Sequence, residues 1–155
     1  MGEDAQRYII GINLLGHDTT ACLTKDGAVA AFVEEERLNR QKHTRAIPFH
    51  AIDAVLKIAG ITMDEVSFVG VSAGFGFQSF WNRCGHYIVR FPVRRWPIML
   101  LGWLRGTRDY LRQVNQIRVH YGIPLSKIVF VPHHDAHLAS AFFVSPFESA
   151  AVLSI

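Results

Sequence analysis

The chain has 155 residues, of which 50% are hydrophobic and 19% are charged. This balance supplies enough apolar side chains for one buried core and excludes a disordered chain. The formal net charge of +3 is too small to indicate nucleic acid as a partner by itself.

Targeting signals and cysteine patterns are also missing from the sequence. Cys22 and Cys84 lie far apart and form neither a disulfide framework nor a metal-binding motif. The N-terminus is polar and acidic, unlike a signal peptide, and the apolar stretch around Leu100 is too short to span a bilayer. We therefore expect a cytoplasmic protein with reduced thiols and no membrane span.

The first part of the chain has the pattern of a strand followed by a β-hairpin. Tyr8–Asn13 is an apolar, β-branched run typical of a buried strand, and residues 21–24 and 28–33 are two further strands. Residues 25–27, Lys-Asp-Gly, join the latter two as a tight turn. The dense polar run 34–43 follows, and such runs are usually solvated faces.

A helix is expected between Pro48, which is favoured in a first turn, and Gly60, which is favoured at a helix end. Its apolar stripe consists of Ala51, Val55, Ile58 and Ala59, with Ile52 and Leu56 beside them. Another short strand follows at 66–71, so the predicted order is β-β-β-α-β.

Residues 74–120 form a variable, arginine- and tryptophan-rich segment. Pro92 and Pro97 are expected to interrupt any long helix, so we predict an amphipathic helix only around residues 111–118. The interleaved arginines and tryptophans of 90–105 can stack on bases, lie at a membrane surface or pack as a helical insertion with solvated arginines. The last alternative is favoured, and an insertion that sets specificity near the substrate remains open.

Three histidines follow the apolar strand 127–131, at the strand end where open α/β sheets bind their ligands. If the segment after it is helical, His133 and His137 project from one face about one turn apart, a spacing suited to two ligands of one metal ion. Asp135 can orient an imidazole or cap the helix. The alternative is that one histidine caps the helix and the others lie on its surface.

The turn after the first strand is the second candidate site. Asn13 and Thr19 lie in a segment rich in donors that can face a phosphate, and His17 can carry a proton near neutral pH. The alternative is a polar turn whose Asp18 satisfies local N–H groups. The polar run adds three cations that can reach an anion, Arg37, Lys42 and His43.

In this order and spacing the motifs resemble the N-terminal part of the nodulation- and antibiotic-type O-carbamoyltransferases. The matching pieces are Gly11-Ile12-Asn13 with His17-Asp18, Asp26-Gly27, Glu34-Glu35-Glu36-Arg37-Leu38 with Arg40, Lys42-His43 and Pro48, His133-His134-Asp135-Ala136-His137, and 140–153. Residues 74–120 have no match, and the Arg/Trp stretch is the main departure.

The resemblance implies an α/β fold, one half of an actin-like ATPase (RNase H-like) domain. It is a mixed sheet with a β-hairpin start and flanking helices, related to the domain that transfers threonylcarbamoyl to tRNA. On this basis residues 1–73 form the first segment, 74–120 the insertion, 121–149 the strand and His-rich helix, and 150–155 the first strand of a second half that is absent.

The resemblance also implies the chemistry. A separate C-terminal domain makes carbamoyl-adenylate from ATP and carbamoyl phosphate, and this part transfers carbamoyl to a hydroxyl of a sugar or secondary metabolite. His17 and Lys42 match the family's reaction-site residues, and Asp18 shapes the same loop. We expect Asn13, Thr19, Arg37 and His43 to contact the co-substrate. His133 and His137 match the ligands of a divalent metal, expected to be iron, with an aspartate of the second half completing the site.

Two other readings remain open from the sequence. One is an inactive half-domain that acts as a binding module. The other is a tRNA-directed relative, which only the basic stretch 90–105 favours. If the chain is part of an O-carbamoyltransferase, we expect no nucleic-acid partner. An isolated half-domain exposes apolar surface, so we also expect self-association. Pocket shape and polar contacts decide which hydroxyl acceptor is used.

Overall fold

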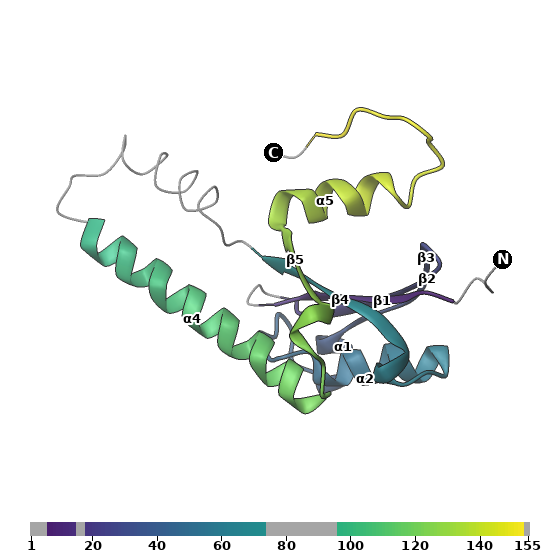
Figure 1. The fold of residues 1–155 in the computed structure, drawn as a ribbon. Helices are drawn as coiled ribbons and strands as arrows, with labels where there is room; N and C mark the ends of the chain where they lie inside the picture. Colours follow the sequence, from purple (N-terminus) through teal and green to yellow (C-terminus); the bar gives the residue numbers. More distant parts are fainter. Residues whose placement is uncertain (1–5, 15–17, 74–95, 154–155) are drawn as a thin grey trace.

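The computed structural model describes residues 6–14, 18–73 and 96–153, and within them a mixed five-stranded sheet has the order β3-β2-β1-β4-β5 (Figure 1). The elements in chain order are β1 (Tyr8–Asn13), β2 (Thr20–Lys25), β3 (Ala28–Glu34), α1 (Glu35–Asn39), α2 (Phe49–Ala59), η1 (Met63–Glu65), β4 (Val66–Ala73), α4 (Trp96–His120), η3 (Leu125–Lys127), β5 (Ile128–Pro132) and α5 (His133–Phe142). The predicted α/β class, the mixed sheet and its hairpin start are confirmed.

β1 lies at the centre of the sheet and determines the direction of its neighbours. It pairs antiparallel with β2 and parallel with β4, while β3 continues the antiparallel side and β5 the parallel side. The hairpin between β2 and β3 turns at Asp26 and Gly27, both with positive φ (50° and 86°). Left-handed conformation at both central residues gives the backbone twist that two-residue hairpins favour.

One edge of the sheet therefore collects the polar segments. β1, β4 and β5 are parallel and end together, and the antiparallel pairing brings the start of β2 and the end of β3 to the same edge. Asp18, helix α1 and the first turn of α5 all lie there. Local strand direction alone thus places two candidate sites, far apart in sequence, on one edge.

The core lies between one face of the sheet and helices α2 and α4 (Figure 1). α2 packs on β2 and β3 and buries Ala51, Ile52, Val55 and Leu56. The predicted stripe was wrong at Ile58, whose side chain is 64% exposed. The helix carries apolar residues on several faces, so the sequence permits a buried stripe with Ile58 or one with Ile52. Packing against the sheet selects the stripe that contains Ile52.

Helix α4 is longer than the sequence predicts. It starts at Trp96 and runs for 25 residues, with Pro97 in its first turn, where proline lacks only an N–H that has no helical partner. Pro97 therefore begins the helix rather than breaking it, and Pro92 lies outside the described residues. The C-terminal half of α4 joins the core through Tyr110, Val114 and Ile117.

No helix in the described ranges has both the length and the apolar content needed to cross a membrane.

The two isoleucines of α2 provide a matched test of its orientation. Ile52→Ala removes a side chain that is 0% exposed and is expected to lower the free energy of unfolding by about 2–5 kcal/mol. Ile58→Ala on the exposed face should change it by less than about 0.5 kcal/mol. Urea unfolding followed by circular dichroism measures both, and equal effects would contradict the helix orientation described here.

Candidate functional site

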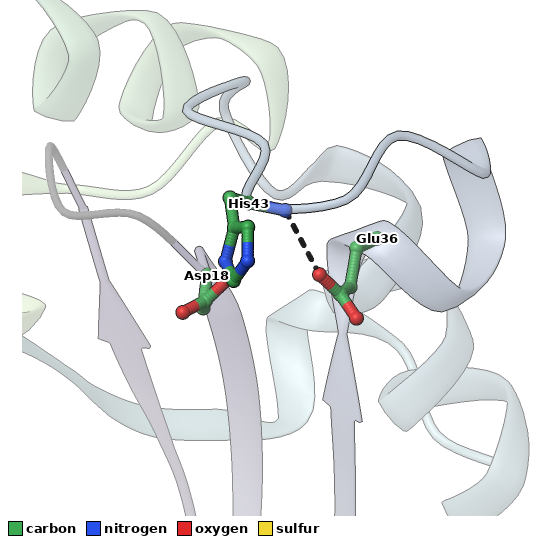
Figure 2. Close-up of side chains that lie close together, drawn as sticks. All are labelled: Asp18, Glu36 and His43. Atoms are coloured by element: carbon green, nitrogen blue, oxygen red, sulfur yellow. Dashed lines mark hydrogen bonds and ion pairs between the residues drawn. The ribbon is translucent and has the colours of Figure 1, made fainter.

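Three side chains from separate segments meet at the polar edge of the sheet (Figure 2). Asp18 precedes β2, Glu36 lies on α1 and His43 follows α1. His43 Nδ1 lies 2.9 Å from Asp18 Oδ1, and the His43 backbone N–H donates to Glu36 Oε2 at 3.0 Å. Within the described ranges, this is the group of three potential metal-ligating side chains whose ligand atoms lie within 4.8 Å of one another. We refer to it as the polar cluster.

The backbone of the polar cluster adopts an uncommon conformation. Asp18 and His43 have φ of 66° and 54°, and Arg40, which ends α1, has φ of 61°. Non-glycine residues in this left-handed region are uncommon and strained, and they persist where surrounding contacts impose them. One such contact is the Asn13 side-chain N–H donating to the Asp18 carbonyl at 3.3 Å. Asn13, predicted to bind a co-substrate, thus closes the loop after β1.

The pairing of His43 with Asp18 determines what the cluster can do chemically. When a neutral imidazole donates from Nδ1 to the carboxylate, Nε2 becomes its proton-accepting nitrogen. Such an aspartate fixes the orientation of the ring and its tautomer. The geometry therefore suits proton transfer, and it suits contact with an anionic group when both ring nitrogens carry a proton.

Glu35 connects the polar cluster to the core. Its side chain is 1% exposed and accepts two hydrogen bonds, from the Ala51 backbone N–H at 2.8 Å and from His50 Nδ1 at 2.5 Å. Its own N–H donates to the Thr19 carbonyl at 2.9 Å. The N-cap residue of α2 is Pro48, which has no capping side chain, so the carboxylate of Glu35 satisfies the start of α2 from a neighbouring helix.

Glu35 also changes the protonation of His50. Its hydrogen bond and negative charge raise the pKa of His50, with a smaller contribution from Asp53. Burial of Tyr121 raises the pKa of its hydroxyl group, which donates to Asp53 Oδ1 at 2.7 Å and to the Phe49 carbonyl at 3.2 Å.

The other predicted residues of this edge occupy different environments. Thr19 is buried, and its hydroxyl donates to the Ala46 carbonyl at 2.9 Å, so a ligand does not reach it in this structure. Arg37 is exposed and pairs with Glu34 at 3.0 Å. Lys42 is exposed beside His43. His17 lies outside the described residues.

The histidine pair lies at the start of α5. His133 and His137 are on one face of the helix as predicted, with their Nε2 atoms 3.1 Å apart. Two imidazoles that each bind one ion at about 2.1 Å and meet near a right angle have a nitrogen separation of about 3 Å. Ser72, at the end of β4, lies 3.3 Å from His133 Nδ1 through its hydroxyl group. The pair therefore fits two ligands of one metal ion.

The two groups share an edge but come from different strands. The polar cluster lies on the side of β1, β2 and β3, whereas the histidine pair follows β5 on the other side of β4. The structure thus brings Asp18 and His43 together and places the histidine pair along the same edge.

Sequence reasoning missed Glu35, Glu36 and Ser72. The polar run 34–43 was expected to be a solvated face, yet it contains the short helix α1 and a buried carboxylate. A signal was present, because a triple glutamate directly after a strand and ahead of a proline-led helix can supply a cap. Which of the three glutamates points into the core depends on the residue at which β3 ends, Glu34.

Comparison with known proteins shows the family to which the chain belongs. The family model described as the carbamoyltransferase N-terminus matches residues 8–155. The chain belongs to the carbamoyltransferase N-terminal family, as the motifs predicted.

Two longer proteins align with nearly the whole chain. An uncharacterised protein, sll1178, of Synechocystis sp. is 35% identical over 94% of this chain. The nodulation protein NolNO of Sinorhizobium fredii is 33% identical over 92% of it. The chain spans 25% and 20% of the length of these two relatives, respectively, so most of each relative lies outside the matched region.

The His50–Glu35 pair predicts a specific pH dependence of stability. Because the folded pKa of His50 is raised above the ordinary value of 6.5, its contribution is complete below about pH 6.5 and is lost as the pH rises through the folded pKa. The urea midpoint should therefore fall over this range in the wild type. His50→Gln and Glu35→Gln should each flatten that slope, and a slope unchanged in both variants would contradict the pairing.

Proposed function

We propose that this chain is the N-terminal part of the transfer domain of an O-carbamoyltransferase. The reaction moves the carbamoyl group of carbamoyl-adenylate to a hydroxyl of a sugar or secondary metabolite. The observation that carries the proposal is the shared edge, where the polar cluster and the histidine pair come from strands on either side of β4. Family membership supports the same reaction class.

The fold part of the proposal is one half of an actin-like ATPase domain. Support comes from the sheet, in which an antiparallel three-strand meander continues into two parallel strands reached through helical connections. The relatives extend over four to five times the matched length. We propose that the remainder includes the second half and a domain that forms carbamoyl-adenylate from ATP and carbamoyl phosphate.

The residues of this chain supply the acid–base and electrostatic parts of the reaction. The acceptor oxygen attacks the carbamoyl carbon, the bond from that carbon to the phosphate oxygen breaks, and adenylate leaves. His17 takes the hydroxyl proton in this proposal. Asn13 and Asp18, which flank it in the sequence, are joined by a hydrogen bond. Lys42 stabilises the negative charge that develops on the phosphate, and His43, oriented by Asp18, contacts the same anion.

His133 and His137 hold a divalent ion in this proposal, and we expect iron. Imidazole nitrogens suit first-row transition metals, and two such ligands leave positions for oxygen atoms and for a carboxylate from the second half. When bound, the ion supplies Lewis-acid stabilisation of oxygen atoms. Ser72 orients the His133 ring through Nδ1.

The metal assignment has a matched test on one helical turn. In the full-length protein, His133→Ala and His137→Ala should each lower bound metal at least tenfold, because each removes one of two ligands. His134→Ala, which removes the exposed neighbour, should retain it. Elemental analysis of purified protein measures all three. Metal retained in both ligand variants would reject the assignment.

The transfer step is tested with ATP, carbamoyl phosphate and candidate hydroxyl acceptors. His17→Ala and Lys42→Met should each lower kcat by about 10²–10⁴, whereas Lys57→Met, an exposed lysine of α2, should leave it unchanged. Circular dichroism checks folding. Normal turnover in both site variants would reject their roles.

The same assay separates the alternatives. A folded, full-length protein without any carbamoyl transfer would favour the binding module. Incorporation into tRNA instead of a small acceptor would favour the tRNA-directed relative.

A further inference from the structure

Helix α4 contains an exposed surface that the proposed chemistry does not use. Its C-terminal half packs on the core through Tyr110, Val114 and Ile117, while its N-terminal half extends away from the sheet (Figure 1). Leu100, Leu101, Leu104 and Leu111 are each about half exposed, at 46%, 53%, 49% and 51%.

The exposed residues form two adjacent stripes along the helix. Leu100, Leu104 and Leu111 follow one line at i, i+4 and i+11. Beside it runs a second line with Leu101, Arg105, Arg108 and Arg112 at i, i+4, i+7 and i+11, and all three arginines are exposed. The arginine line lies opposite the buried stripe of the helix, and the leucine line lies between the two, about a quarter turn from each. We call the exposed side of residues 100–112 the basic face.

The charge of the chain is concentrated in this region. In the sequence, residues 74–120 contain eight of the sixteen basic residues and one of the thirteen acidic residues, a net charge of +7, whereas the remaining residues carry −4. A basic helix with an apolar stripe is typical of elements that lie on membrane surfaces. It is not a membrane span, since no described helix meets the length and hydropathy needed.

We propose that the basic face of α4 binds the surface of a membrane rich in anionic phospholipids. The arginines pair with lipid phosphates, and the leucines enter the boundary between headgroups and acyl chains. A nucleic acid matches the arginines equally well but offers no apolar layer for a leucine line along the same helix. The proposal is independent of carbamoyl transfer.

Vesicle sedimentation of the full-length protein tests the proposal. Binding is expected to vesicles that contain phosphatidylglycerol, weaker binding to pure phosphatidylcholine, and a decrease as salt is raised. Arg105→Gln/Arg108→Gln/Arg112→Gln should lower the partition coefficient on the order of 100-fold, and Leu101→Ser/Leu104→Ser should lower it at least tenfold.

The matched control removes the same number of charges elsewhere. Arg7→Gln/Arg45→Gln/Lys57→Gln changes exposed residues outside α4 and should bind vesicles within about threefold of the wild type. Melting temperatures identify any variant that fails to fold. Absence of binding by the folded wild type, or equal losses in the control and arginine variants, would overturn the proposal.

Two further outcomes identify other occupants. Leu104→Cys should react with a water-soluble maleimide without lipid and become protected by anionic vesicles. Protection without lipid would show that another part of the protein covers the helix, which overturns the proposal. Arginine-dependent binding of RNA without vesicle binding would also overturn it.

Discussion

The buried carboxylate of Glu35 is the interaction on which the edge of this domain depends. The carboxylate accepts hydrogen bonds from the ring of His50 and the Ala51 N–H in the first turn of α2, and the Glu35 N–H donates to the Thr19 carbonyl just before β2, so that α1 is joined to two other segments. A buried carboxylate needs such partners because an unpaired one loses its hydration without compensation. Glu36 and the turn that contains His43 follow directly, so their positions are set by a residue that contacts no substrate in the proposed reaction.

The strand directions explain why the two candidate groups share an edge. The carboxyl ends of the parallel strands β1, β4 and β5 lie at one edge of the sheet. The antiparallel pairing of β1 with β2 places the start of β2 at the same edge. Each group contributes something different. The polar cluster pairs an imidazole with a carboxylate, and in the proposed reaction this imidazole contacts the leaving phosphate, whereas the histidine pair presents two nitrogens 3.1 Å apart, which suits a metal. The proposed reaction needs both kinds of group around one small substrate.

The sequence predicts the regular elements well and the tertiary choices poorly. β1 has the predicted bounds, α2 ends at Gly60 and the His-rich segment is helical, because each carries a strong local signal. The inward turn of Glu35, the exposure of Ile58 and the start of α4 near Pro97 depend on what the rest of the fold places beside them. For the site, the side-chain types and the His133–His137 spacing are local, but the meeting of Asp18 with His43 requires the backbone conformation of two turns. The catalytic and metal roles remain predictions.

The two candidate groups also differ in the length of chain that must be closed to form them. Asp18 and His43 are separated by 25 residues, and the strands, turn and helices that hold them are contiguous in sequence. The Ser72–His133 contact spans 61 residues and requires the parallel crossover through α4. Because closing a longer loop costs more chain entropy and slows pairing, the first group can assemble early on the ribosome while the second waits for the end of this segment. An arrest of synthesis within α4 would leave a nascent chain able to form the polar cluster but unable to form the histidine pair.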